Sequence, residues 1–485
     1  MKILFVASEV APFAKTGGLA DVTGSLPVAL KRLGHDVRII LPLYKTVGEG
    51  PFPIHKGRKS VEIPLGETLR KGFLRQSTSA DIPVYLLENR FFFHRDHLYG
   101  TPAGDYPDNH QRFAFFCRGV LDLLKRMDFR PDILHCHDWQ TALVPVLLRY
   151  AHREDPFFMS TATLFTIHNL AYQGLFPKTS LGEMGFDWSY FTIDRLEYYD
   201  QVNLMKGGIL TADLVTTVSP SYCNEILSVE QGCGLEGVLA QRRDDLYGVL
   251  NGLDPEEWDP ATDRHIFKTY TPAAPAGKAV NKRGLQKRLG LEVAPDIPLV
   301  GMVTRLASQK GIDLLTAILP RLEGDENVQL VLLGAGDEAY HQLFEDFNAR
   351  GVGNISLNIG YDSVCARQIY AGSDIFLMPS HYEPCGLGQL IALRYGAVPV
   401  VRKTGGLADT VFDGRDGSRE PNGFTFDDFT ADALWEALQR ALQSYRQRDA
   451  WKKLVRRGMS RDYSWQQSAG EYERLYRVAL GKKRL

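Results

Sequence analysis

Two basic side chains, five positions apart, offer a site for a phosphate-bearing ligand. Arg305 and Lys310 follow a predicted buried strand over 299–304 and precede a predicted helix that begins near Gly311. A loop between a strand and a helix can direct both cations toward one point, where they would stabilise negative charge on a departing phosphate. Two solvated surface cations fit this spacing equally well, so spacing alone leaves both interpretations open.

A glycine-rich segment offers a second place where an anion could be held. Lys15-Thr-Gly-Gly-Leu-Ala-Asp21 recurs with identical residues at 403–409, and each copy joins a predicted strand to a predicted helix. Glycine permits a tight turn there, and the N–H groups of a helix N-terminus favour an anion. Two copies fit one ligand clamped between two similar halves, whereas the alternative is a strand–turn–helix used twice for packing. No Gly-Lys-Ser/Thr follows, so neither copy is a Walker A loop.

Glu383 and His168 are candidates for contact with a sugar. Glu383 follows a predicted buried strand, and Pro384 disfavours helix at Glu383, so its carboxylate is expected in a loop. There it could bind hydroxyls or stabilise a cationic transition state, or it could cap a helix. His168 ends a predicted strand, where an imidazole can reach a substrate, although a structural role is the commoner one for histidine.

Metal and nucleophile motifs are missing from the sequence. His135 and His137 alternate along one predicted strand, but no third ligand is evident, and no H-E-x-x-H is present. There is no G-x-S-x-G nucleophile elbow and no Asp-x-Asp clamp for a metal diphosphate. Cationic side chains are therefore the expected partners of phosphate, and we predict neither a metal nor a cofactor.

The elements that would position these residues form two series of strands. Apolar runs without alternation are typical of strands buried on both faces, and helices between them imply parallel sheets. The expected strands are 2–7, 36–41, 83–87, 133–137, 164–168 and 214–219, then 299–304, 329–333, 355–359, 375–379 and 398–401. We predict two doubly wound α/β domains with a hinge in the turn at 250–255.

Composition excludes several classes of protein. The 56 basic and 58 acidic residues give a net charge of −2. This balance lacks the excess of positive charge that is typical of proteins that bind nucleic acid or an anionic membrane. Six cysteines without a C-x-x-C pair argue against a disulfide framework and against structural zinc. No run approaches the roughly 18 apolar residues of a membrane helix. We expect a cytoplasmic protein.

Taken together, the motifs resemble those of the bacterial glycogen synthases, ADP-glucose-dependent retaining glycosyltransferases related to plant starch synthases. The resembling segments are 15–21, 108–113, 137–139, 168–174, 218–221, 251–254, 305–311, 383–387 and 404–409. The resemblance implies a GT-B architecture, in which two facing Rossmann-like domains enclose a deep interdomain cleft. The expected N-terminal, acceptor-side domain is 1–250 joined by the C-terminal helix 463–485, and the expected donor-side domain is 251–462.

The resemblance also implies roles for particular residues. The catalytic group would comprise Lys15, His168, Arg305, Lys310 and Glu383. Donor binding would involve Lys15, the backbone of Gly17 and Gly18, Asp21, Asn251, Tyr361 stacked on the base, and the backbone of Cys385, Gly386, Leu387 and Gly388. Asp138 and Trp139 are expected on the acceptor side, with Trp139 as a sugar-stacking surface. Gly388 replaces the family's usual threonine, which removes a hydroxyl near the donor phosphates.

The reaction implied by the resemblance is transfer of glucose from ADP-glucose to the non-reducing end of glycogen or another α-1,4-glucan, with retention of configuration and release of ADP. One alternative keeps this fold but uses UDP-glucose or a small-sugar acceptor. The other is a catalytically silent glucan-binding protein. The sequence does not fix the oligomeric state, the preferred primer length or any allosteric control.

Overall fold

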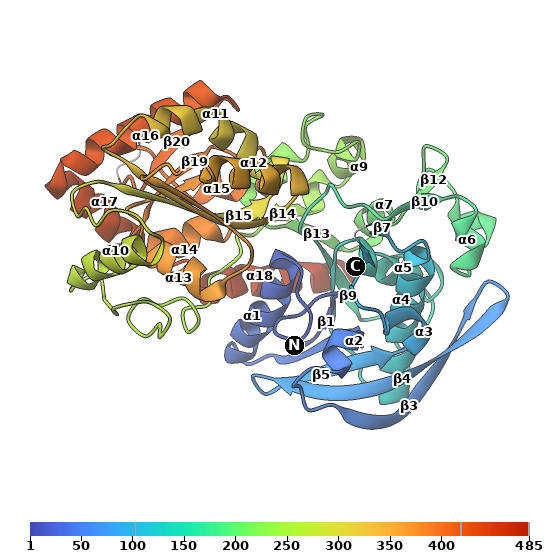
Figure 1. Cartoon of the computed structure of the whole chain (residues 1–485). Coiled ribbons are helices and arrows are strands. Elements are labelled where there is room, and N and C mark those ends of the chain that lie inside the picture. Colours follow the sequence, from blue (N-terminus) through green and yellow to red (C-terminus); the bar gives the residue numbers. More distant parts are fainter. Residues whose placement is uncertain (102, 418–419, 484–485) are drawn as a thin grey trace. The chain divides into compact units, whose positions relative to one another are not determined.

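The computed structural model describes residues 1–101, 103–417 and 420–483, which form two compact units (Figure 1). Unit 1 contains Met1–Gly252 and Trp465–Leu485, and unit 2 contains Leu253–Ser464. The boundaries expected from the sequence lie at 250 and 462, close to those in the structure. None of the helices in the described ranges is both long and apolar enough to cross a membrane.

The described part of unit 1 is built on a nine-stranded sheet in the order β14-β13-β9-β8-β1-β2-β5-β4-β3. Its strands are β1 (Lys2–Val6), β2 (Asp36–Pro42), β3 (His55–Leu65), β4 (Thr68–Ser79), β5 (Ile82–Glu88), β8 (Ile133–His137), β9 (Ala162–Ile167), β13 (Leu214–Thr217) and β14 (Leu246–Gly248). The strands from β14 to β5 pair in parallel, as apolar runs flanked by helices predict.

The antiparallel edge of this sheet corrects the expectation of purely parallel sheets. Strands β3 and β4 form a hairpin, and β4 pairs antiparallel with β5. Side chains along β3 and β4 alternate between buried and exposed positions over much of their length. A search for unbroken apolar runs misses such strands, because strands with one solvated face read as alternating patterns.

Helices and short strands complete unit 1. They are α1 (Gly18–Arg32), α2 (Lys45–Gly48), α3 (Arg90–Phe93), β6 (Gly100–Thr101), β7 (Gly104–Asp105), α4 (Asn109–Met127), α5 (Leu143–Tyr150), β10 (Leu175–Pro177), α6 (Ser180–Glu183), β11 (Glu197–Tyr198), β12 (Gln201–Asn203), α7 (Leu204–Thr211), α8 (Pro220–Glu225), α9 (Glu236–Gln241) and α18 (Trp465–Lys483). Helix α18 contacts α1 and β9, and Tyr476 Oη lies 2.8 Å from His135 Nδ1. The last helix of the chain is therefore part of the core of unit 1.

The described part of unit 2 has a six-stranded parallel sheet in the order β17-β16-β15-β18-β19-β20. Its strands are β15 (Leu299–Leu306), β16 (Gln329–Gly336), β17 (Ile355–Ile359), β18 (Ile375–Met378), β19 (Val398–Arg402) and β20 (Phe424–Phe426). Its helices are α10 (Ala276–Arg288), α11 (Ile312–Glu323), α12 (Glu338–Asn348), α13 (Ser363–Gly372), α14 (Gly388–Arg394), α15 (Gly405–Thr410), α16 (Ala431–Arg446) and α17 (Arg448–Ser460). Apolar clusters with α11 and α16 on one face of the sheet, and with α10 and α13 on the other, form its two cores (Figure 1).

Both sheets reverse their strand order beside their first strand. In unit 1, β1 pairs with β2 on one side and β8 on the other, and in unit 2, β15 pairs with β16 and β18. The carboxyl ends of neighbouring parallel strands at such a reversal are where open α/β sheets bind ligands. The order in unit 2 is that of the doubly wound Rossmann fold.

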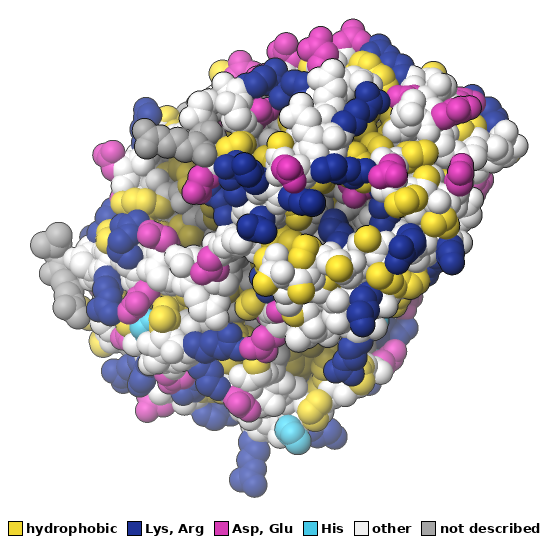
Figure 2. All heavy atoms as spheres, turned by 90° about the vertical axis from the view of Figure 1, so that its left-hand side faces the viewer, with side chains coloured by type: hydrophobic (Ala, Val, Ile, Leu, Met, Phe, Trp, Pro, Cys, Tyr) yellow, Lys and Arg dark blue, Asp and Glu magenta, His cyan; other side chains and the backbone are white. Residues whose placement is uncertain are grey.

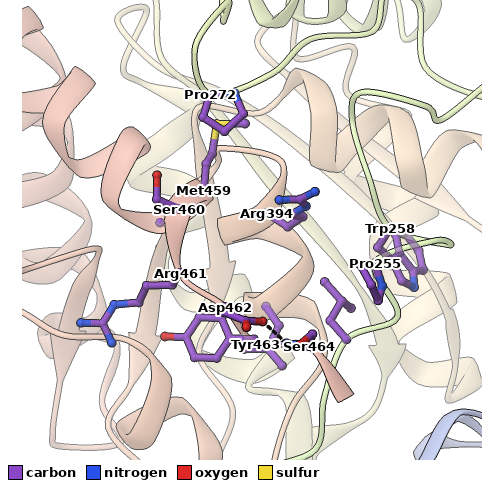
Figure 3. A pocket seen from close by; sticks show the side chains of 13 residues that line it. Pro255, Trp258, Pro272, Arg394, Met459, Ser460, Arg461, Asp462, Tyr463 and Ser464 are labelled. Atoms are coloured by element: carbon purple, nitrogen blue, oxygen red, sulfur yellow. Dashed lines mark hydrogen bonds between the residues drawn. The ribbon is translucent and has the colours of Figure 1, made fainter. Parts of the chain in front are cut away.

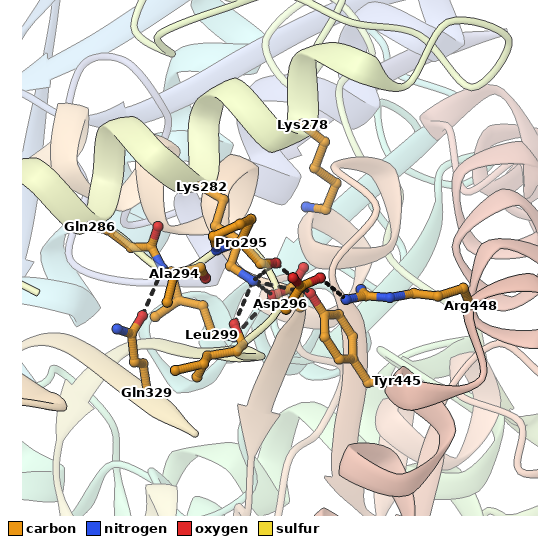
Figure 4. Close-up of polar contacts among 12 residues, drawn as sticks. Lys278, Lys282, Gln286, Ala294, Pro295, Asp296, Leu299, Gln329, Tyr445 and Arg448 are labelled. Atoms are coloured by element: carbon orange, nitrogen blue, oxygen red, sulfur yellow. Dashed lines mark hydrogen bonds and ion pairs between the residues drawn. The ribbon is translucent and has the colours of Figure 1, made fainter. Parts of the chain in front are cut away.

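A buried polar network fixes α10 against the amino ends of the central strands of unit 2 (Figure 4). Lys282 Nζ pairs with Asp374 Oδ2 at 2.7 Å and donates to Tyr445 Oη at 3.1 Å. Asp374 also accepts from the Leu299 N–H at 2.9 Å. Because Asp374 precedes β18 and Leu299 begins β15, this carboxylate aligns the two strands whose opposite ends carry the predicted site residues.

Candidate active site

Lys310 and Glu383 form an ion pair beyond the carboxyl ends of β15 and β18. Lys310 Nζ lies 2.6 Å from Glu383 Oε2, and Ser380 Oγ donates to the same oxygen at 3.0 Å. The Glu383 side chain is 8% exposed and that of Lys310 is 19% exposed. Lys310 ends a short 3₁₀ turn after β15, and Glu383 lies in the loop after β18. The two neighbouring strands thus bring both predicted residues to one point.

Arg305 lies close by, in the last part of β15, with an exposed side chain. Its Nη2 approaches Gln309 Oε1 at 3.4 Å, and no ion pair of Arg305 is found among the described residues of unit 2. Gln309, which sequence reasoning missed, donates from its side-chain Nε2 to Tyr382 O at 3.2 Å, and its backbone carbonyl accepts from the His381 N–H at 2.8 Å. Gln309 therefore ties the loop after β15 to the loop that carries Glu383.

The second glycine-rich copy packs directly against the backbone of the Glu383 loop. A Cβ atom added at Gly405, where φ is +45°, would lie 2.0 Å from Glu383 O, and one added at Gly406 would lie 2.1 Å from Cys385 O. The Gly406 N–H donates to Glu383 O at 3.1 Å. These contacts show that the second copy packs against the Glu383 loop, as the packing interpretation expects, while its contact with a ligand stays a prediction.

The backbone from Cys385 to Gly388 forms a tight turn at the start of α14. Gly386 has φ +77°, and Gln389 Nε2 donates to the carbonyls of Cys385 and Gly386, each at 3.0 Å. Leu387 is the residue before the first turn of α14, and Gly388 begins that helix. A Cβ atom at Gly388 would lie 3.1 Å from the Met378 sulfur, so Met378 occupies part of the space that the side chain of the family's usual threonine would need.

Tyr361 presents its ring to solvent. It follows β17 directly after Gly360, whose φ is +132°, and it is 93% exposed. An open aromatic face can stack on a nucleobase. This exposure suits the role that the resemblance implies for Tyr361.

In unit 1, the first glycine-rich copy has open space where the second copy is packed. A Cβ atom added at Gly17 or Gly18 would meet no heavy atom within 4 Å. Lys15 Nζ pairs with Asp21 Oδ1 at 2.5 Å across this loop, and the Lys15 side chain is 54% exposed. The same seven residues thus leave room for a ligand in unit 1 and fill a packing contact in unit 2.

Glu9 holds the first glycine-rich loop in place, and sequence reasoning did not identify this role. Its carboxylate accepts from Thr16 N at 2.5 Å, from Gly17 N at 3.2 Å and from Tyr99 Oη at 2.8 Å. The Gly17 N–H therefore already has a partner within the protein, and its proposed contact with a diphosphate stays a prediction. Gly18 begins α1, and the first N–H groups of a helix have no partner within it. The available signal was an acidic residue three positions after the last residue of a buried strand.

His168 and His137 contact each other at the ends of the neighbouring strands β9 and β8. His168 Nε2 lies 3.0 Å from His137 Nδ1. Burial lowers the pKa of His168 to about 3 and holds the pKa of His137 well below its usual value, so both rings are neutral near pH 7. His135 lies two residues before His137 on β8. It contacts Tyr476 Oη and Thr166 Oγ1 instead, which is a structural role.

Asp138 connects the loops after β8 and β9. Its Oδ1 accepts from the His168 N–H at 2.7 Å, and its backbone has φ +55°, a left-handed conformation that few side chains adopt. Burial, assisted by the nearby charge of Glu9, raises the pKa of Asp138 to about 7. The side chain therefore changes charge within the physiological range of pH.

Trp139 does not fit its expected role as a sugar-stacking surface. It is 8% exposed, and its ring packs edge-on against Phe113 at 5.0 Å and Phe176 at 5.7 Å between centroids. A Cβ atom at Gly174 would lie 2.6 Å from the indole, so the backbone also covers the ring. Trp139 belongs to the core of unit 1.

Asn251 lies near the end of the first segment of unit 1 and is buried. Its Oδ1 has no hydrogen-bond partner within 1–101, 103–417 and 420–483. A buried polar atom without a partner carries a free-energy cost. Asn251 therefore keeps an unsatisfied acceptor, which is buried in this structure.

A cavity of about 450 Å³ in unit 2 lies apart from these residues (Figure 3). Its wall includes Trp258, Arg394 and residues 458–464, and it contains none of the predicted site residues. Its Arg394 pairs with Asp259 at 3.0 Å. This cavity is therefore not part of the candidate active site.

Comparison with known proteins identifies the family. Residues 2–241 match the family described as the starch synthase catalytic domain, and residues 288–457 match glycosyl transferases group 1. A glycogen synthase from Geotalea daltonii is 66% identical over 100% of both chains, and glycogen synthase 2 from Geobacter sulfurreducens is 60% identical over 100% of both. The solved structure of the catalytic domain of starch synthase IV from Arabidopsis thaliana, bound to ADP and acarbose, is 38% identical and covers 99% of both chains with a TM-score of 0.91. This chain belongs to the glycogen and starch synthase family of glycosyltransferases.

Proposed function

We propose that the chain transfers glucose from ADP-glucose to the non-reducing end of an α-1,4-glucan, with retention of configuration and release of ADP. The observation that carries this proposal is the buried Lys310–Glu383 pair beside Arg305, in a chain 66% identical to a glycogen synthase. The related starch synthase whose structure holds ADP and acarbose supports an adenine nucleotide and a glucan as the two ligands.

In unit 2, Arg305 and Lys310 are proposed to hold the diphosphate of the donor. Arg305 has no competing carboxylate among the described residues of unit 2, whereas Lys310 is 2.6 Å from Glu383. When a diphosphate binds, Lys310 gains a second anionic partner, and both cations stabilise the charge that develops on the leaving group. Glu383, fixed by Ser380, supplies a negative charge toward the glucose as its anomeric carbon becomes cationic.

Unit 1 is proposed to supply the remaining contacts. Lys15 and the first turn of α1 at Gly18 provide positive charge and N–H donors for phosphate. His168, with its neutral ring, is proposed to contact a glucose hydroxyl, while Asp21 and Asn251 line the donor site. Asp138 remains a proposed acceptor-side residue through its contact with the loop of His168.

The proposed reaction requires no side-chain nucleophile, metal or cofactor. The bond between the anomeric carbon and the diphosphate oxygen breaks, and the 4-hydroxyl of the glucan attacks on the same face. The proton of that hydroxyl passes to an oxygen of the departing diphosphate, and the new glycosidic bond forms with retained configuration. Exclusion of water during this step limits hydrolysis of the donor.

One assay tests the proposal. ADP and UDP release are measured from ADP-glucose and UDP-glucose, each with and without glycogen, on the same purified sample. Glycogen-dependent release of ADP alone is the expected result. Equal use of both donors would contradict the proposed donor specificity, and binding of glycogen without release of either nucleotide would replace the proposal with a glucan-binding protein.

A further inference from the structure

A second cavity in unit 2, of about 440 Å³, lies against helices α16 and α17 and contains none of the predicted active-site residues. Four basic side chains line it, together with an apolar surface made by Pro421, Phe424 and Leu454. The basic residues are Arg415, Arg440, Lys453 and Arg457. We call this cavity the basic pocket. Figure 2 looks onto the side of unit 2 that carries α16 and α17, and Lys and Arg side chains gather across the middle of that face.

Asp413 is the one acidic residue among the described residues that line the basic pocket, and its hydrogen bonds are already used. Its Oδ2 accepts from Arg440 Nη1 at 2.7 Å and from Thr425 N at 3.0 Å, and its Oδ1 accepts from Arg415 N at 3.0 Å. The Arg415 guanidinium lies 3.6 Å from the same carboxylate. Asp413 therefore offsets the charge of Arg440 and, in part, that of Arg415.

Lys453 and Arg457 remain without such compensation. They are four residues apart on α17, so their side chains lie on one face of the helix, where like charges repel. No ion pair of either residue is found among 1–101, 103–417 and 420–483, and the polar contact of Arg457 is a long one, 3.4 Å from Nη1 to Pro421 O. Two uncompensated cations therefore face the same cavity.

We propose that the basic pocket binds a phosphomonoester that carries an apolar body. A phosphomonoester has a charge of about −1.5 to −2 near neutral pH, which matches the pair of cations on α17. The apolar surface of Phe424, Leu454 and Pro421 gains from contact with an apolar group and gains little from a bare phosphate or a sugar. The cavity volume lies within the range of small-molecule sites, about 300–1,000 Å³. This site is additional to the donor and acceptor sites of the proposed reaction.

The test uses 1-naphthyl phosphate, whose fluorescence reports binding, titrated into the full chain at low salt. Saturating ADP is present throughout, so that the donor site is already filled. The expected result is saturable binding of 1-naphthyl phosphate. Its dissociation constant should be at least about tenfold lower than that of 1-naphthol and than the inhibition constant of inorganic phosphate as a competitor. Binding no tighter than that of the two parts, or binding that appears only when ADP is left out, would overturn the proposal.

A matched pair of charge reversals locates the site. Lys453→Glu places a carboxylate in the lining and should weaken binding at least about tenfold. Lys452→Glu makes the same change one residue away, where the side chain is 76% exposed and lies outside the lining; its ion pair among the described residues is with Asp449, at 3.9 Å. Its binding should equal that of the unmodified chain. Equal losses in the two variants would show a general effect of charge and would overturn the proposal.

A milder substitution separates a lost site from a lost fold. Arg457→Gln keeps a polar side chain of similar length and should also weaken binding, with an unchanged midpoint of thermal unfolding. Replacing the probe by 1-naphthoate, which carries one negative charge, should weaken binding to the unmodified chain. Binding of 1-naphthyl phosphate that survives both Lys453→Glu and Arg457→Gln would exclude the basic pocket as its location.

Discussion

His137 Nδ1 lies 3.0 Å from His168 Nε2, so two neutral imidazoles share one hydrogen bond at the ends of β8 and β9. One nitrogen must carry the proton. His137 Nε2 is buried and has no partner in the described part of the chain. Buried N–H groups without partners are rarer than unpaired acceptors. The network therefore assigns the shared proton to His137 Nδ1 and leaves His168 with a proton on its own Nδ1, which can donate to a sugar oxygen.

The first prediction concerns His168→Asn. Loss of a hydrogen bond between a neutral ring and a glucose hydroxyl costs about 0.5–1.5 kcal/mol, which corresponds to a reduction of about 2- to 10-fold in kcat. Burial lowers the pKa of His168 to about 3, so this ring does not change its charge between about pH 5 and 8. The pH profile of ADP release should therefore keep its shape in the variant. A limb near neutral pH that disappears with His168 would contradict the assignment.

The second prediction concerns Asp138→Asn and the pH dependence of stability. Burial and the charge of Glu9 raise the pKa of Asp138 from 3.8 to about 7. Between these values the folded chain holds a proton that the unfolded chain has released, so this group lowers the free energy of unfolding as pH rises from about 4 to 7. Denaturant titrations across that range should show a shallower decline in the variant. An unchanged slope would show that Asp138 titrates normally.

The fold was largely predictable because its central strands are buried on both faces. The segments 3–6 of β1, 299–303 of β15 and 375–378 of β18 are unbroken apolar runs, and such runs are recognisable without tertiary information. Strands β3 and β4 were not, because their alternating side chains resemble many exposed segments. The same local information placed Glu383 and Lys310 after neighbouring strands, but only the structure brings their atoms to 2.6 Å.

Other features of the site depend on contacts between distant segments. Glu9 accepts hydrogen bonds from the N–H groups of Thr16 and Gly17 and so anchors their loop. The residues adjacent to Glu9 in the sequence do not indicate which N–H groups it contacts. Trp139 follows a strand like a site residue, yet Phe113 and Phe176 cover it. The two identical glycine-rich copies differ only in what lies against them, and identical sequences cannot disclose that difference.

The third prediction uses these two copies as a matched pair. Gly405→Ala adds a Cβ atom 2.0 Å from Glu383 O at a residue with φ +45°, so overpacking and left-handed strain should together cost about 2–5 kcal/mol of stability. Gly17→Ala makes the equivalent change in open space at φ −157°, at the N-cap of α1, where alanine is less favourable than glycine, and should cost no more than about 1 kcal/mol. Denaturant unfolding measures both. Equal losses would contradict the different roles of the copies.

The fourth prediction concerns Lys278, whose Nζ donates to Ala371 O at 3.1 Å and Tyr395 O at 3.0 Å. Burial lowers its pKa from 10.5 to about 7. Between these values the unfolded chain binds the additional proton, so this group makes the free energy of unfolding rise with pH over that range, and its full cost is present below about pH 7. Lys278→Met should remove that rise, whereas Lys287→Met, exposed on the same helix, should keep it. A rise that persists in Lys278→Met would contradict the shift.

The last prediction concerns the cations beside Glu383. Arg305→Ala or Lys310→Ala removes a charge that acts on the leaving diphosphate, and each should lower kcat by about 10²- to 10³-fold. Lys310→Ala also leaves Glu383 Oε2 with Ser380 Oγ at 3.0 Å as its remaining partner among the described residues, so the buried carboxylate loses its compensating charge. The free energy of unfolding should therefore fall in Lys310→Ala and stay unchanged in Arg305→Ala, whose side chain is exposed. Initial rates of ADP release and denaturant titrations on the same two proteins separate the two effects. Turnover like that of the unmodified chain in both variants would remove Arg305 and Lys310 from the catalytic group. A loss of turnover without any loss of stability in Lys310→Ala would show that the ion pair does not stabilise the fold and acts on the diphosphate alone.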